Sequence, residues 1–219
     1  MISLGDKKMK KILAIVLALA CVFGMMSCTG KGPSLDSFKT AIANTNPATV
    51  EIDTKLETGM GDLVGEFVVT YAEDGSATID YSYEVFNELG ANVTELKRVE
   101  EGTVEINAAG EYSGTLSGTL SGVGEYKLNL DNGKMTGATI NGNVLEAGIK
   151  AANTKAVLGV EIAADVTMTL TKGTSGIVSL VIVYETEQGP ATITCTYQQA
   201  AAAEEDKGLK RTASIYWFS

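Results

Sequence analysis

The 219-residue sequence contains no histidine, and this absence removes several kinds of enzyme site at once. Nucleophile triads with a histidine base, histidine general bases and the most common zinc ligand are all excluded. The glycine-rich phosphate loop and the Gly-x-Ser-x-Gly nucleophile turn are also missing from the sequence. We therefore expect a protein that is not an enzyme and that uses no metal or other cofactor.

Cysteine is scarce as well, with only Cys21, Cys28 and Cys195, so the chain cannot build a framework of disulfides. The roughly 190 residues after position 28 must instead be stabilised by an ordinary hydrophobic core, and that length suffices for one domain. Cys195 alternates with threonines in residues 192–197. We interpret it as a small, buried, apolar side chain on a strand.

The first 28 residues have the order of a secretory signal peptide. Four lysines between positions 7 and 11 precede an apolar run over residues 12–26, which is followed by Ser27 and Cys28. A transmembrane helix needs about 20 apolar residues, more than this run provides. A cysteine directly after the cleavage site can be acylated, so the segment resembles a bacterial lipoprotein signal with a degenerate lipobox. We predict a signal peptide over 1–27, a lipidated cysteine and tether over 28–33, and a single β-rich domain over 34–219.

Two cysteines compete for the lipid, because residues 18–21 also resemble a lipobox that ends at Cys21. We favour Cys28, since cleavage there leaves a polar tether, whereas cleavage before Cys21 leaves an apolar N-terminus. Two acyl chains anchor a protein stably and one does not. The expected location is the outer face of the cell membrane, or an outer membrane if the host has one.

Acidic residues dominate the predicted mature chain. Removal of residues 1–27 takes away four lysines and one aspartate and leaves 13 basic and 26 acidic side chains, a net charge of −13. This charge repels phosphate backbones and anionic headgroups alike. We expect no nucleic-acid partner, membrane attachment through the N-terminal lipid alone, and either an amphiphile ligand or an envelope protein as partner.

Past the tether, a short helix is expected from Ser34, which can act as its N-cap, to a point before Pro47. From position 50 the apolar residues recur at every second position, as in a strand with one buried face. Residues 63–86 predict a hairpin around a turn at 73–76. Further strands are expected near 96–107, 112–120, 125–130, 160–170, 177–184, 191–197 and 209–218, with turns at 131–133, 141–142 and 172–176. One mid-chain segment, residues 143–157, has roughly helical spacing of its apolar residues.

Three further patterns in the sequence bear on a possible site. The glycine-rich repeat over 114–122 indicates either a surface hairpin or a low floor beneath a ligand. The adjacent carboxylates Glu100 and Glu101, like the acidic run at 204–206, are predicted to be solvated surface. Residues 129–133 faintly resemble a calcium loop, but the spacing of the carboxylates is wrong and the final acidic ligand is missing.

The order of elements resembles bacterial lipoproteins of the LolA/LolB and mycobacterial LprG/LppX type. The pieces that fit are the two strands over 61–72 and 76–86 and the closing strands over 160–197. The resemblance implies a curved half-barrel sheet that holds lipid on its concave face, with helices as a lid. It carries no signature motif and assigns no binding residue.

We therefore predict a mainly β protein with a single antiparallel, strongly curved sheet, either half-barrel or sandwich-like, and one or two short helices. Two functions remain open: binding of a hydrophobic or amphiphilic ligand such as lipid, or an envelope interaction module with a solid core. In the first case, the apolar residues of one strand face would line a cavity. The candidate lining residues are Phe67, Val69, Tyr71, Ile79, Tyr81, Leu116, Leu120, Val166 and Met168.

Overall fold

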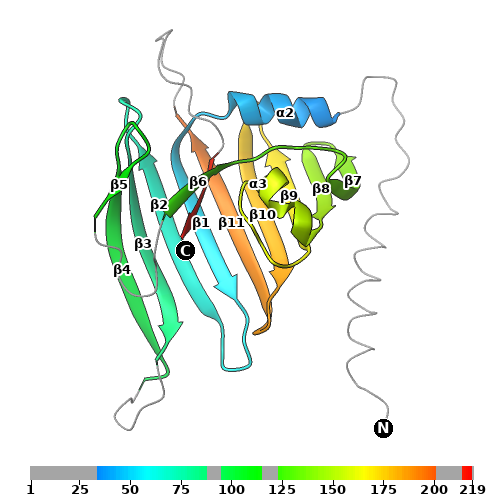
Figure 1. The fold of residues 1–219 in the computed structure, drawn as a ribbon. Helices are drawn as coiled ribbons and strands as arrows, with labels where there is room; N and C mark the ends of the chain where they lie inside the picture. Colours follow the sequence, from blue (N-terminus) through cyan, green and yellow to red (C-terminus); the bar gives the residue numbers. More distant parts are fainter. Residues whose placement is uncertain (1–33, 88–94, 115–122, 201–213, 219) are drawn as a thin grey trace, which may run out of the picture. The chain divides into compact units, whose positions relative to one another are not determined.

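One antiparallel sheet of ten strands dominates the computed structural model (Figure 1). The structure describes residues 34–87, 95–114, 123–200 and 214–218. The strand order is β5-β4-β3-β2-β1-β11-β10-β9-β8-β7, and the sheet is not closed. The N-terminal and C-terminal halves of the chain therefore meet in the middle of the sheet, where β1 pairs with β11. The prediction of a mainly β fold with a single antiparallel sheet and short helices is confirmed.

The described residues form strands, two α-helices and one 3-10 turn. Their bounds are α2 (Leu35–Asn44), β1 (Pro47–Leu56), β2 (Leu63–Tyr71), β3 (Ala77–Phe86), β4 (Lys97–Ile106), β5 (Tyr112–Ser113), β6 (Val123–Lys127), β7 (Met135–Asn141), β8 (Val144–Ile149), a 3-10 turn (Ala151–Asn153), α3 (Thr154–Leu158), β9 (Val166–Lys172), β10 (Ile177–Glu185), β11 (Pro190–Gln199) and β12 (Ser214–Phe218). Strands β6 and β12 pair with each other in a separate two-stranded sheet.

The register of the large sheet places its buried side chains on one face, which we call the apolar face. Ile52, for example, lies opposite Phe67 of β2 and Cys195 of β11. Since directly paired residues share a face, the apolar face runs without interruption from β4 to β8. Its buried members include Val50, Ile52, Phe67, Val69, Ala77, Ile79, Tyr81, Val104, Ile106, Leu145, Ala147, Ile149, Val166, Met168, Leu170, Leu180, Ile182, Ala191, Ile193, Cys195 and Tyr197.

The opposite face, which we call the polar face, carries the charged and threonine residues that alternate with them. It includes Glu51, Asp53, Lys55, Glu66, Asp80, Glu101, Glu105 and the threonines of β9 and β11. The alternation seen in the sequence is thus the alternation of one solvated and one buried face.

Helix α2 packs against the sheet where β10 begins. Phe38 is fully buried, and the Ile177 amide donates a 2.8 Å hydrogen bond to the buried hydroxyl of Thr45, just after the helix. The predicted helix is confirmed, but its start differs in detail: Ser34 occupies the N-cap position without a side-chain capping bond. The hydroxyl of Ser37 instead donates to the Ser34 carbonyl at 2.7 Å.

The helix expected over residues 143–157 is wrong for its first half. Val144–Ile149 is strand β8, and α3 begins only at Thr154. The turn at Asn141 and Gly142, where Gly142 has φ +59, reverses the chain into a hairpin with β7. Leu145 and Ile149 are four apart and so fit a helical period, but with Ala147 between them they also fit a strand, and pairing to β9 decides for the strand.

Two expected strands are shorter than predicted. Strand β9 starts at Val166, so 160–165 is not part of the strand, although Ile162 is buried. Strand β6 ends at Lys127, and Leu128 and Leu130 instead contribute to the core from a loop. The hairpin over 63–86 and the three consecutive antiparallel strands β9, β10 and β11 are confirmed.

Cys195 is fully buried, as predicted. Burial, and secondarily the charge of Asp53, raises the pKa of its thiol to about 12. An unfolded chain loses this proton near pH 8.5, so the thiol's contribution to stability is complete below that pH and is lost as the pH rises toward 12. In a chain with Cys21 and Cys28 replaced by Ala, we expect a thiol reagent at pH 9 to react only after denaturant is added. Rapid labelling of the folded chain would contradict this burial.

Candidate functional site

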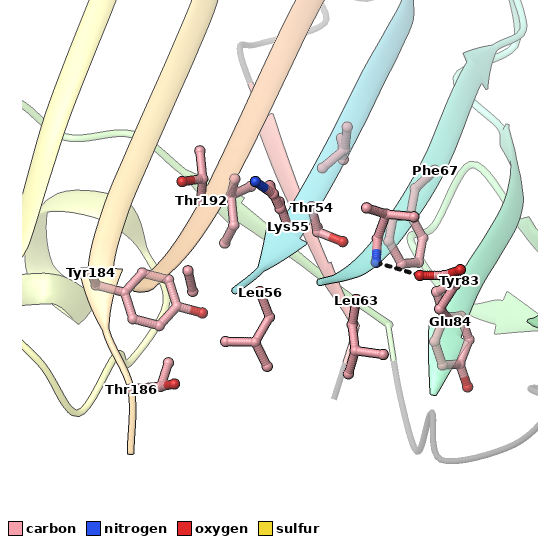
Figure 2. Close-up of a pocket in the computed structure, with 14 residues that line it drawn as sticks. Thr54, Lys55, Leu56, Leu63, Phe67, Tyr83, Glu84, Tyr184, Thr186 and Thr192 are labelled. Carbon is pink, nitrogen blue, oxygen red and sulfur yellow. Dashed lines mark hydrogen bonds between the residues drawn. The ribbon is translucent and has the colours of Figure 1, made fainter. Parts of the chain in front are cut away.

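A pocket of about 350 Å³ opens on the apolar face, near the ends of the central strands (Figure 2). It lies at the junction of β1, β2 and β11, with contributions from the ends of β3 and β10. The lining residues on the apolar face or just beyond the strand ends are Ile52, Thr54, Leu56, Leu63, Phe67, Tyr83, Tyr184, Thr186, Ala191 and Ile193; Lys55, Val64, Glu84 and Thr192 complete it. Its volume falls at the low end of the range typical of small-molecule sites.

The pocket forms where the end of β1 meets the start of β2 and the start of β11. Leu56, the last residue of β1, lies opposite both Leu63 and Ala191, which belong to hairpins far apart in sequence. The Glu57 amide donates a 2.9 Å hydrogen bond to the Pro190 carbonyl and fixes the strand ends together. A small side chain at Ala191, between Leu56 and Tyr184, leaves the space open.

The wall on the β2–β3 side is aromatic. The rings of Phe67 and Tyr83 are nearly parallel, with centroids 6.4 Å apart and an interplanar angle of 14°. Gly65 lies opposite Tyr83 in the register and two residues before Phe67, and a Cβ there would approach Tyr83 Cβ at 3.0 Å and the Thr54 hydroxyl oxygen at 2.7 Å. The missing side chain therefore lets both rings lie flat against the sheet, and Phe67 also stacks with Tyr81 at 6.3 Å.

Glu100 contacts this wall and is the buried polar residue that the sequence interpretation did not predict. Its side chain is only 8% exposed, because residues 98, 100 and 102 of β4 share the apolar face with Val104. The Tyr83 hydroxyl donates a short hydrogen bond to one carboxylate oxygen, and Arg98 donates to the other from Nη2 at 2.6 Å and from Nε at 3.1 Å. The prediction of a solvated Glu100 is wrong; Glu101, on the polar face, is exposed.

This burial of Glu100 follows from parity. Counting back in steps of two from the buried Ile106 and Val104 passes Gly102 and reaches Glu100. A carboxylate at such a position needs charged or hydroxyl partners. The alternation of buried residues along β4 therefore predicts a buried Glu100, although the adjacent Glu101 makes the pair resemble a charged surface run.

Charged pairs lie beside the pocket on the polar-face side, where Lys55 and Glu84 reach its lining. Lys55 contacts Glu57 at 2.9 Å and Asp62 at 3.0 Å, and Lys97 contacts Glu84 at 3.1 Å. Hydrogen bonds from Lys97 and from the Val64 amide lower the pKa of Glu84. Hydrogen bonds to Glu57 and Asp62 raise the pKa of Lys55. Glu84 and Lys55 are therefore charged at neutral pH.

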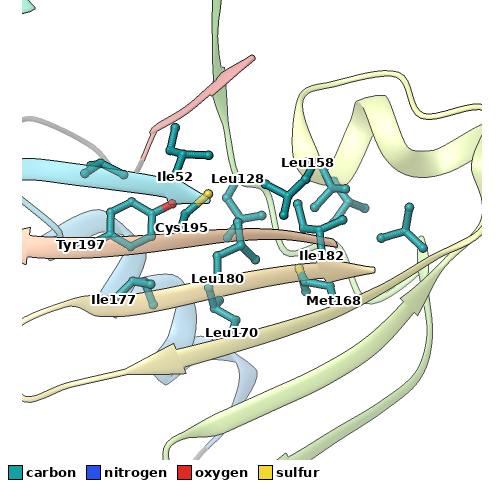
Figure 3. Packing of buried hydrophobic residues seen from close by; sticks show 14 of the residues in the cluster. Ile52, Leu128, Leu158, Met168, Leu170, Ile177, Leu180, Ile182, Cys195 and Tyr197 are labelled. Atoms are coloured by element: carbon teal, nitrogen blue, oxygen red, sulfur yellow. The ribbon is translucent and has the colours of Figure 1, made fainter. Parts of the chain in front are cut away.

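Of the predicted lining residues, Phe67 lines this pocket. Val69, Ile79, Tyr81, Val166 and Met168 lie in the packed core instead, and Tyr71 is half-buried against it. Leu116 and Leu120 lie outside the described residues. Beneath α3, buried side chains of the apolar face pack with Leu128, Val157 and Leu158 in the hydrophobic core (Figure 3).

Within the described residues, no group of histidine, cysteine, aspartate or glutamate side chains is arranged to hold a metal ion. Among the same residues, no helix has the length and apolar character needed to cross a membrane. No protein-family model matches the sequence, and a search of curated proteins finds no similar chain.

Proposed function

We propose that this protein is an exported, lipid-anchored envelope protein that binds the apolar part of a small amphiphile in the pocket between β1, β2 and β11. The observation that carries the proposal is the pocket itself: about 350 Å³ of space next to the buried hydrophobic core. Aliphatic side chains on one side and the Phe67 and Tyr83 rings on the other supply apolar contact. Burial of apolar ligand surface there supplies the binding free energy.

The hydroxyls of two pocket threonines are already hydrogen-bonded. Thr54 lies in the floor between Ile52 and Leu56 and donates a 3.3 Å hydrogen bond to the Gly65 carbonyl, and Thr186 donates a 2.7 Å bond to the Gly189 carbonyl. Burial raises the pKa of the Tyr184 phenol, so this group stays protonated at neutral pH. A mostly apolar lining with a few polar groups is typical of small-molecule sites and suits an amphiphile.

Filling the mouth tests the proposal. Ala191→Phe places a ring between Leu56 and Tyr184, and we expect at least a tenfold loss of affinity for an uncharged hydrophobic dye such as N-phenyl-1-naphthylamine. Because the site has room, the free energy of unfolding should change by less than about 1 kcal/mol, whereas overpacking a solid core costs about 1–3 kcal/mol.

The matched control for this change is Thr194→Phe, three residues further along β11 and on the polar face. It should leave dye affinity at the wild-type value. If the unsubstituted protein binds no dye, and Ala191→Phe destabilises it as in a filled core, the protein is an interaction module without a ligand.

Anchoring has its own test. We expect lipid on Cys28, so Cys28→Ala should release the protein from the membrane fraction or leave an unprocessed precursor. Membrane fractionation and intact mass give the readout. If Cys28→Ala fractionates like wild type while Cys21→Ala does not, the lipid is attached to Cys21.

A further inference from the structure

We infer that the pocket accepts one acyl chain of roughly 10 to 14 carbons, borne on a headgroup without net negative charge, an inference that rests on the proposed function. A single-chain amphiphile such as a monoacylglycerol fits this description. A two-chain membrane lipid and a long-chain fatty acid anion do not.

The volume sets the size of the chain. A cavity of about 150 Å³ holds benzene, with six carbons. On that scale, the pocket's volume of about 350 Å³ corresponds to roughly 14 carbons when it is completely filled. A second acyl chain of comparable length has no space beside the first.

The pocket lining ends partway along the central strands. Ile52, Phe67 and Ile193 are its innermost residues on β1, β2 and β11. The next apolar-face residue on each of these strands is Val50, Val69 or Cys195, and all three are completely buried. A chain that enters beside Leu56 therefore stops at Ile52, about 13 Å further along the strand.

Charge beside the pocket disfavours an anionic headgroup. Two ammonium groups, Lys55 and Lys97, face three carboxylates at distances of 2.9–3.1 Å, from Glu57, Asp62 and Glu84. Both lysines beside the pocket are thus already paired, and these five charged groups sum to one negative charge. An incoming carboxylate or phosphate monoester would have to displace one of these partners, whereas an uncharged glycerol headgroup would not.

The test is native mass spectrometry of the full chain released from phospholipid nanodiscs, titrated with monoacylglycerols of 8, 10, 12, 14, 16 and 18 carbons. We expect non-covalent adducts whose occupancy peaks between 10 and 14 carbons and falls at least fivefold by 18. Dodecanoate and a didodecanoyl glycerol should each show at least fivefold lower occupancy than monododecanoylglycerol.

Two variants locate the bound chain. Ile193→Ala removes atoms from the deep end and should move the preferred length toward longer chains, while Ala191→Leu narrows the mouth and should lower occupancy at every length. Val183→Ala, on the polar face of β10, is the control and should change neither the preferred chain length nor the occupancy. The Ala191→Leu arm remains informative if Ile193→Ala does not fold.

The outcomes distinguish failure of this inference from failure of the proposed function. Adducts that show no length limit, or equal occupancy by dodecanoate or by the two-chain lipid, would overturn this inference while leaving ligand binding intact. If no probe forms an adduct at all, the proposed function fails.

Discussion

Replacing Leu180 by Ala is expected to lower the free energy of unfolding by about 2–5 kcal/mol, because the side chain is completely buried and the surrounding sheet cannot close the cavity. Leu180 lies opposite both Leu170 and Cys195 on the apolar face, away from the pocket. Denaturant titration gives the stability and dye titration the binding. The variant should bind dye with wild-type affinity wherever it remains folded.

Leu56→Ala is the companion change, since Leu56 is the same residue type but lies half-buried at the pocket mouth. Here we expect a smaller loss of stability, below about 1.5 kcal/mol, together with weaker dye binding, because less apolar surface becomes buried. Equal stability losses for the two leucines would mean that the space around Leu56 is packed like the core.

Replacing Glu100 by Ala should cost about 1.5–3 kcal/mol of stability, the range for hydrogen bonds to a charged group. The change removes the acceptor of the Tyr83 hydroxyl and the partner of Arg98, and it frees the Tyr83 ring that forms the pocket wall. Dye affinity should fall along with stability.

The adjacent residue supplies the control, because Glu101 lies on the polar face. Glu101→Ala should change stability by no more than about 0.5 kcal/mol, as is usual at exposed positions, and should leave dye binding unchanged. If the two substitutions have the same effect, Glu100 does not support the wall.

Much of the sheet could be predicted from local patterns. The alternation over residues 50–56 and 63–71 identified the buried face of β1 and β2, and the turn at 73–76 identified their neighbour β3. The pattern failed at 143–149, where Leu145 and Ile149 satisfy two periods and only pairing with β9 selects the strand. The prediction for Glu100 is wrong because two adjacent charges suggest a solvated surface, whereas its position, four residues before the buried Val104, places it on the apolar face.

The pocket could not be predicted in this way. Its mouth depends on β1 lying beside β11, which brings Leu56 next to Ala191 across about two thirds of the chain. The spacing of apolar residues within any one segment does not encode that strand pairing. Whether an apolar residue such as Val69 or Phe67 meets a packed core or open space depends on what covers the sheet above it.

The most direct measurement is the native mass of the protein as purified from cells, with any bound ligand retained. Native mass spectrometry of the chain purified from a bacterial host, with organic extraction of anything bound, should show a non-covalent, single-chain amphiphile that disappears on denaturation and is absent from Ala191→Phe. A wild-type protein that carries only its covalent lipid, yields no extractable ligand and takes up none on titration would contradict the account.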